Sequence, residues 1–394
     1  MTLLRRLLPS LVFASLFQAA AGAPFIRQTK DAPRFRGEQT LTVSSIPKAA
    51  RPEGGLAIGS SISISGNWIA VRQDSLLSTP VIHLFQRRSN RLWLRKPWKW
   101  RAAVACGYGD IHLHDDQLIS PDPESGLQIH RLENGQWIKI QNLATAVGNQ
   151  PIRLIGRNGK MAVGQEYLYS SFSAIQALDF DSASNSWKIE DVVYSNSAAQ
   201  PWVITDRCAD RIIGCEFASG KAATIFEKGP AGWSPAGDLS PPASHNDTSS
   251  LWAPPSYDAL FTERGTIAVL AKHSDFIGNP IRNTLLQYQL DPTTGVWQHE
   301  EEREVDWPQS RLVMIGDHIA MYGARTDFLG NSLPGQMVLF DEHNQKVSHS
   351  RNAVANMSWS TNRLITSDCV SDFLGNTVGT GVKIYRMTPP KSAR

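Results

Sequence analysis

The amino-acid sequence predicts an all-β protein, a single β-propeller of about seven four-stranded blades. Short runs of alternating apolar and polar residues, each bounded by turn residues, follow one another along the chain. A unit of four such runs recurs about every 50 residues, a period typical of propeller blades. No long stretch repeats its apolar residues with the 3.6-residue period of a helix, which argues against a helical solenoid.

Each unit reads as strand, tight turn, strand, loop, strand, hairpin, strand, as in "SSISISGNWIAVR" (Ser60–Arg72) followed by "VIHLFQRRSNRLWLRKPW" (Val81–Trp98). The first turns of the seven units fall at Gly66, Asp115, Asn158, Ala209, Arg264, Gly316 and Thr361. In the first five units, tryptophans are expected to open the fourth strand: Trp93, Trp137, Trp187, Trp233 and Trp297. Seven blades are therefore expected, with six or eight left open.

The two ends of the repeat array predict how the ring closes. The last unit stops after its third strand, "GVKIYRM" (Gly381–Met387), and is followed by Pro389 and Pro390. A strand-like run, "EQTLTVSSI" (Glu38–Ile46), precedes the first unit. We expect this run to supply the missing strand, because an open blade edge would otherwise remain. The propeller is thus predicted over residues 38–388, after an N-terminal segment 22–37 and before a C-terminal tail 389–394.

The first 21 residues have the layout of a secretory signal peptide. Arg5 and Arg6 precede an apolar centre, Leu7–Phe17, and small residues follow. Cleavage is expected after Ala21, with Ala23 as the alternative. The apolar centre is shorter than the roughly 20 residues that span a bilayer, so no membrane insertion is expected. The mature protein is expected to be secreted or periplasmic.

Composition excludes few functions. Without Arg5 and Arg6, 39 − 2 = 37 basic residues face 36 acidic ones, a net charge of +1. This near balance says little about partners. Nucleic acid is not expected as a partner, and a monomer is expected. The four cysteines leave two alternatives open, one or two disulfides or buried thiols: Cys106, Cys208, Cys215 and Cys369.

The opening of the first unit resembles a known repeat family. "GSSISISGNWIAV" (Gly59–Val71), followed by "VIHLFQR" and Trp93, is similar to the FG-GAP repeats of integrin-alpha-type propellers, with "IG" in place of "FG". The resemblance implies a propeller of the integrin-alpha type. Calcium-binding members carry a D-x-D-x-D-G loop that this sequence lacks, so calcium binding is not carried over to any residue. No residue is assigned to a metal and no cofactor is expected, while metal binding itself is left open.

One phrase occurs three times, at Ser274–Asn279, Thr326–Asn331 and Ser371–Asn376. It is expected between the second and third strands of the last three units, and so on one face of the ring. One interpretation is a self-supporting turn, in which the aspartate accepts hydrogen bonds from its own loop and the glycine supplies a positive φ. The other is a binding row made by Asp275, Asn279, Asp327, Asn331, Asp372 and Asn376. We favour the turn for the aspartates and phenylalanines, and expect a partner on the surrounding face.

Two further groups are candidates for binding. A basic and aromatic strip could hold an acidic partner by charge and stacking, although such residues also protect an exposed edge strand: Arg87, Arg88, Arg95, Lys96, Trp98, Lys99 and Trp100. "HLHDD" places His112 and His114 on one side of a strand, a spacing that suits zinc, but the sequence offers no third ligand. We favour edge protection for the strip, and a solvated or hydrogen-bonded position on the strand for the two histidines.

The sequence contains no nucleophile elbow, no H-E-x-x-H, no phosphate-binding glycine loop and no dinucleotide fingerprint. A secreted, non-catalytic binding module is therefore expected, with an unidentified protein or glycan as partner. The alternative is an extracellular glycan hydrolase or lyase, because propellers can assemble a site from several blades without a local motif.

Overall fold

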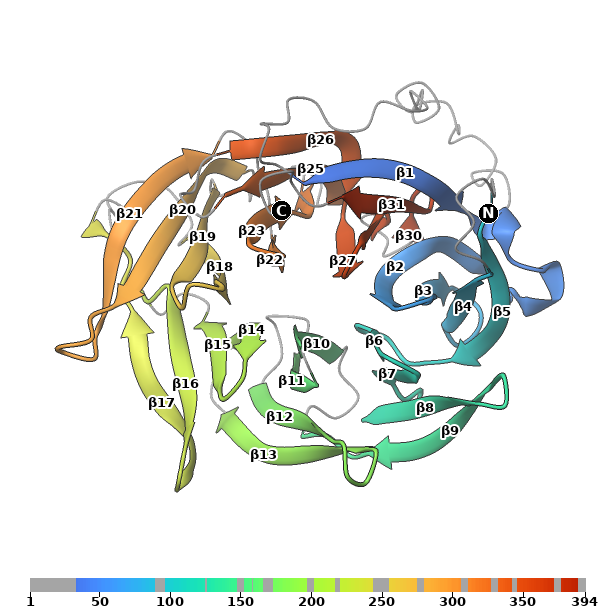
Figure 1. The fold of residues 1–394 in the computed structure, drawn as a ribbon, viewed down its shortest axis with the longest axis horizontal. Helices are drawn as coiled ribbons and strands as arrows, with labels where there is room; N and C mark the ends of the chain where they lie inside the picture. Colours follow the sequence, from blue (N-terminus) through green and yellow to red (C-terminus); the bar gives the residue numbers. More distant parts are fainter. Residues whose placement is uncertain are drawn as a thin grey trace, which may run out of the picture.

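A computed structural model shows the seven blades arranged as a ring (Figure 1). It describes residues 33–388 except 89–95, 125, 147–151, 158, 166–172, 197–201, 217–219, 244–254, 275–279, 306–310, 327–331, 342–345 and 372–376. The first strand of each blade lies nearest the centre and the fourth lies outside. The predicted fold class is confirmed.

The strands follow one another outward in each blade, paired antiparallel with their neighbours. The first three blades contain β2 (Gly55–Ser65), β3 (Trp68–Ser75), β4 (Val81–Arg87) and β5 (Trp98–Ala105); β6 (His112–His114), β7 (Gln117–Pro121), β8 (Leu127–Glu133) and β9 (Gln136–Leu143); and β10 (Ile152–Arg157), β11 (Lys160–Gln165), β12 (Ser173–Asp181) and β13 (Ser186–Asn196).

The remaining blades follow the same plan, with short additions near the end of the chain. Blades four and five contain β14 (Trp202–Cys208), β15 (Arg211–Glu216), β16 (Ala223–Gly229) and β17 (Gly232–Leu239); and β18 (Ser256–Phe261), β19 (Ile267–Ser274), β20 (Pro280–Leu290) and β21 (Trp297–Val305). Blade six contains β22 (Arg311–Ile315), β23 (His318–Tyr322), β25 (Ser332–Phe340) and β26 (Lys346–Val354), with β24 (Ala324–Thr326) paired to β25. Blade seven contains β27 (Asn356–Ser360), β28 (Arg363–Ser367) and β31 (Val382–Thr388), with a small hairpin of β29 (Val370–Ser371) and β30 (Thr377–Val378) between the last two.

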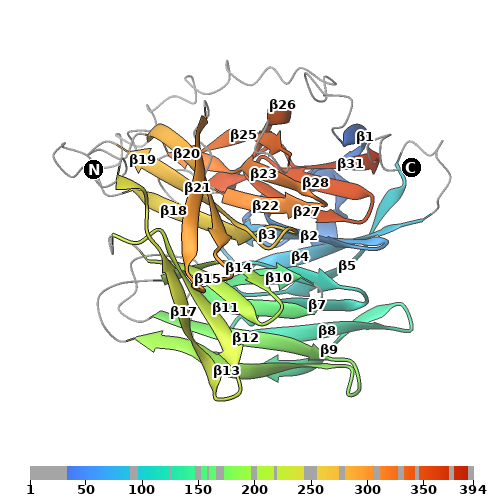
Figure 2. The ribbon, with the colours of Figure 1, turned by 60° about the vertical axis from the view of Figure 1, so that its left-hand side comes forward.

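The N-terminal strand closes the ring, as predicted. β1 (Arg34–Leu41) pairs antiparallel with β31 and becomes the fourth strand of blade seven. The two strands, blue and red, lie side by side in both views (Figures 1 and 2). The predicted bounds, Glu38–Ile46, are wrong because the strand begins and ends earlier. Thr42 N–H donates to Ser45 Oγ at 3.1 Å and starts a 3₁₀ turn, η1 (Val43–Ser45), which η2 (Lys48–Ala50) follows.

Six of the seven predicted first turns lie where expected, while Asn158 lies outside the described residues; several of the six have a left-handed backbone. Gly66, Asp115, Ala209 and Gly316 have φ between 50° and 61° at the turn between the first and second strands. In blade one, the described fourth strand begins at Trp98, and Trp93, the expected start, lies outside the described residues.

The core is distributed between the blades. Among the described residues, each hydrophobic cluster joins two neighbouring blades; Phe85 and Ile384, for example, belong to one cluster, and Leu84 and Leu118 to another. Blades one to seven are linked in this way all around the ring, including the contact of the last blade with the first. A blade sheet that buries both faces against neighbours cannot leave the ring without exposing two apolar surfaces. Within the described residues, no helix has the length and apolar character needed to cross a membrane.

Candidate functional site

The antiparallel order of the strands gives the ring two different faces. The second-to-third-strand connections and the inter-blade connections lie on one face, here called the loop face; residues 76–80 and 106–111 belong to it. The turns between first and second strands, such as Gly66, and those between third and fourth strands lie on the other, the turn face. Connections are where propellers and other rigid scaffolds usually carry binding residues.

The three repeated phrases connect strands on the loop face. The strand ends that flank them are paired, Ser274 with Pro280, Thr326 with Ser332 and Ser371 with Thr377. The candidate residues themselves lie outside the described residues: Asp275, Asn279, Asp327, Asn331, Asp372 and Asn376. Whether their side chains brace the loop or contact a partner stays a prediction.

The basic and aromatic strip is divided by the fold. Arg87 and Trp98 are buried, and both contact Glu38 of the closing strand, with Arg87 Nη2 at 3.0 Å and Trp98 Nε1 at 3.2 Å from its carboxylate. Trp100 is half-buried on the outermost strand. Arg88, Lys96 and Lys99 are exposed, and Arg95 lies outside the described residues. The two anchoring members therefore hold the ring together and are not available to a ligand.

The histidine pair has separate surroundings. His114 packs edge-on against the rings of Phe180 and Trp187 in the next blade, with centroids 5.1 and 5.4 Å away. Burial, assisted by the neighbouring His114, lowers the pKa of His112 to about 4. Over the described ranges, no group of three or more His, Cys, Asp and Glu side chains is placed to hold a metal ion.

The cysteines are free thiols. All four are described, and none forms a disulfide. Burial raises the pKa of Cys106 and of Cys215 to about 12, so neither thiol ionises at neutral pH.

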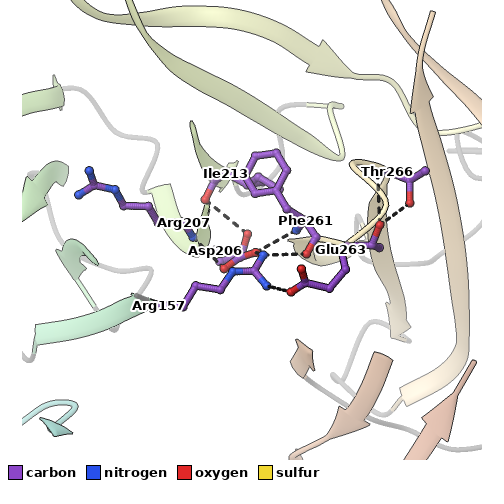
Figure 3. Close-up of polar contacts among 9 residues, drawn as sticks. Arg157, Asp206, Arg207, Ile213, Phe261, Glu263 and Thr266 are labelled. Carbon is purple, nitrogen blue, oxygen red and sulfur yellow. Dashed lines mark hydrogen bonds and ion pairs between the residues drawn. The ribbon is translucent and has the colours of Figure 1, made fainter. Parts of the chain in front are cut away.

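Two arginines of blade three reach across blade four to blade five. Arg153 and Arg157 are four residues apart on β10 and so project from the same side of the strand. Arg153 Nη2 lies 3.7 Å from Asp258 Oδ1 on β18. Arg157 Nη2 donates to Phe261 O at 3.0 Å, and its Nη1 donates to Glu263 at 3.0 Å (Figure 3). These side chains link the first strands of two non-adjacent blades.

Asp206 contacts both Arg157 and Phe261, and so takes part in the link that Arg157 makes to blade five. A register shift in β14 after Ile204 directs its carboxylate toward β18. Oδ2 accepts from Phe261 N–H at 2.9 Å and lies 3.5 Å from Arg157, while Oδ1 accepts from Arg207 N–H at 2.8 Å (Figure 3). Burial outweighs the Arg157 charge and raises the pKa of Asp206 to about 6.

Similar bonds recur between other first strands, and sequence reasoning missed them. Asp258 accepts from Leu312 N–H at 2.5 Å, joining blades five and six. On β2, three alternate serines accept from backbone N–H groups of blade two at 2.9–3.1 Å: Ser61, Ser63 and Ser65. The alternation "SISIS" shows that these hydroxyls share one side of the strand, but it does not show what they meet. These polar groups on the first strands thus connect one blade to the next.

The loop face carries most of the exposed large apolar side chains. Among the described residues these are Leu76, Leu77, Tyr108 and Val378 on the loop face, and Ile138, Val192 and Val296 elsewhere. The first four come from the neighbouring blades seven, one and two. Grouped exposed apolar residues on a soluble protein mark an interaction site more often than scattered ones do.

The comparisons with known proteins identify the fold alone. Neither a family model nor a curated protein matches the sequence. The WD40 domain of coronin from Toxoplasma gondii matches with a TM-score of 0.54 at 10% identity, covering 94% of this chain and 90% of that chain. The β-propeller domain of Cps50 (Swd1) from Myceliophteria thermophila gives 0.52 at 8%, covering 90% and 100%. The polysaccharide lyase Uly1 gives 0.52 at 10%, covering 93% and 100%.

Proposed function

We propose that this chain is an exported, non-catalytic binding module that holds a protein or glycan partner on its loop face. The grouping of exposed apolar side chains on that face, Leu76, Leu77 and Tyr108 above all, carries the proposal. The polar contacts between first strands support the non-catalytic part of the proposal, because the charged side chains there bond one blade to another. We propose export because residues 1–21 resemble a signal peptide. We propose an FG-GAP-like repeat type because of the pattern at Gly59–Val71.

The test uses the mature chain, residues 22–394, on arrays of glycans and of extracellular proteins. A retained ligand that leaves the array chemically unchanged supports a binding module. Turnover of the retained ligand would contradict the non-catalytic part of the proposal. Retention that is lost after substitutions on the turn face, and not on the loop face, would contradict the choice of face.

A glycan hydrolase or lyase is the second candidate, because Asp206 offers a carboxyl group with a raised pKa beside a guanidinium. Such a group can exchange a proton near neutral pH. The lyase Uly1 shows that the same fold occurs in a polysaccharide lyase, which adds only an analogy. Turnover of an acidic or neutral polysaccharide that Asp206→Asn abolishes, with folding intact, would establish the enzyme. If none of a broad panel is cleaved, the second candidate fails.

A further inference from the structure

Three exposed side chains on the loop face lie next to one another. Leu76 is 61% exposed, Leu77 71% and Tyr108 51%. The leucines belong to the connection between β3 and β4, and Tyr108 to the connection between blades one and two. Tyr108 Oη donates to Ser75 O at 3.3 Å, which places the ring beside the leucine segment. Single exposed apolar residues need no explanation, but an adjacent group of this kind does.

The connection that presents Tyr108 is fixed by its backbone. Ile152 N–H donates to Tyr108 O at 3.3 Å, Asp110 N–H donates to Ile152 O at 2.7 Å, and Gly107 N–H donates to Pro121 O at 2.9 Å. Arg72 also donates to Gly109 O. Gly109 has φ +134°, and a Cβ there would lie 2.3 Å from Ile152 O, so the backbone approaches closely only because this residue is glycine.

The leucine segment is held in a comparable way. Leu76 N–H donates to Gly54 O at 3.2 Å, and Leu77 N–H donates to Ser75 Oγ at 3.1 Å. Leu77 packs over Gly54, where a Cβ would lie 2.7 Å from Leu77 Cγ. A partner that binds here meets side chains on an ordered backbone, so little conformational entropy is lost on binding.

Exposed acidic side chains lie on the loop face around Leu76, Leu77 and Tyr108. Glu53 and Glu124 are exposed, and no ion pair to either is found among the described residues. Glu53 adjoins the leucine segment, since its carbonyl accepts from Ser78 Oγ at 3.2 Å. Three nearby cations are engaged within the fold: Arg72 lies 2.9 Å from Asp74, Lys139 lies 2.7 Å from Asp122, and Arg51 Nη2 donates to Ile46 O at 2.8 Å. Glu53 and Glu124 therefore present negative charge to an incoming partner.

We infer that Leu76, Leu77 and Tyr108 form a docking site for an extended segment of a partner protein whose apolar side chains are flanked by lysine or arginine. This inference rests on the proposed function and specifies its partner. Leucine side chains offer no hydrogen bonds to a sugar, whereas apolar contacts around a central aromatic ring are the usual core of a protein interface. Glu53 and Glu124 supply the complement to the basic residues.

The test selects ligands from a displayed library of random 12-residue peptides against the mature chain. Recovered peptides are synthesised and their Kd is measured by fluorescence anisotropy. We expect the recovered peptides to carry apolar residues next to Lys or Arg. They should bind at least tenfold more weakly to Leu77→Asp and to Tyr108→Ala than to the parent. The double variant Glu53→Lys, Glu124→Lys should also bind them more weakly. Val296→Asp is the control, because Val296 is 56% exposed in a third-to-fourth-strand hairpin of blade five, on the turn face. It should bind as the parent does.

Several outcomes would overturn the inference. The first is a selection that enriches no peptide. The second is that the peptides bind Leu77→Asp and Tyr108→Ala as tightly as they bind the parent, while both variants keep the parent's melting temperature. A dimer in size-exclusion chromatography that Leu77→Asp converts to monomer would identify a second copy of the chain as the occupant instead. If the arrays retain a ligand that these variants still hold, the binding module stands and this docking site fails. If the arrays show turnover, the proposed function fails separately.

Discussion

Glu38 and Arg363 are 325 positions apart in the sequence, yet Arg363 Nε donates to Glu38 Oε2 at 3.3 Å. Glu38 lies on β1, and Arg363 on β28, in the blade that β1 completes. The same carboxylate contacts Arg87 and Trp98 of blade one. One side chain thus fastens the closing strand, the last blade and the first blade together.

Replacing Glu38 by Ala should lower the free energy of unfolding by about 3–5 kcal/mol, because two largely buried guanidiniums lose their counter-charge. Urea unfolding followed by tryptophan fluorescence measures the change. Glu301→Ala is the matched control: Glu301 is exposed on β21, and its loss should change the free energy by less than about 0.5 kcal/mol. An equal effect of the two substitutions would show that the Glu38 contacts contribute nothing specific.

Deleting residues 22–47 should lower the melting temperature by about 10 °C or more. The deletion removes the partner of β31 and three buried residues of two inter-blade clusters, Phe35, Leu41 and Ile46. Differential scanning calorimetry measures the loss. Adding a synthetic peptide of residues 33–47 should restore part of it. An unchanged melting temperature would mean that the strand is dispensable for closure.

The Asp206 carboxyl should make stability depend on pH between about 4 and 6. Burial raises its folded-state pKa to about 6 from an ordinary value near 3.8. The folded state therefore holds the proton more tightly, and the contribution of this group is full below pH 4 and is lost as pH rises through 6. The stability of the parent relative to Asp206→Asn, measured by urea unfolding at pH 4, 5, 6 and 7, should fall across this range. A flat or rising difference would contradict the assignment.

The repeated phrase gives a prediction that the sequence alone supports. If each aspartate braces its own loop, Asp327→Ala should lower the free energy of unfolding by about 1–3 kcal/mol. Asp275→Ala and Asp372→Ala should have similar effects, since the phrase is the same. Melting curves of all three variants that coincide with the parent's would instead favour a row of outward-facing binding residues.

The sequence predicts well whatever depends on local pattern. Gly66 and Asp115 lie in tight turns that favour such residues at positive φ, and the alternation of "SISIS" identifies one strand. In blade one the described fourth strand begins at the buried Trp98, another tryptophan of the same run, so a tryptophan alone does not fix where a strand starts. Arg153 and Arg157 could not be linked to Asp258 and Glu263, because contacts across blade four depend on how the ring curves. Tyr108 gave no local signal, since its exposure depends on neighbours far away in sequence.

The closing strand also has a consequence for biosynthesis. A ribosome makes β1 first and β31 last, so the strand that completes the ring must wait, without its partner, until nearly the whole chain has been made. Ring closure is therefore a post-translational step of high contact order, and such steps are slow. During that interval the edge of β1 remains open to pairing with other chains. We expect the nascent protein to depend on holding chaperones more than a propeller whose final blade is built from one contiguous segment.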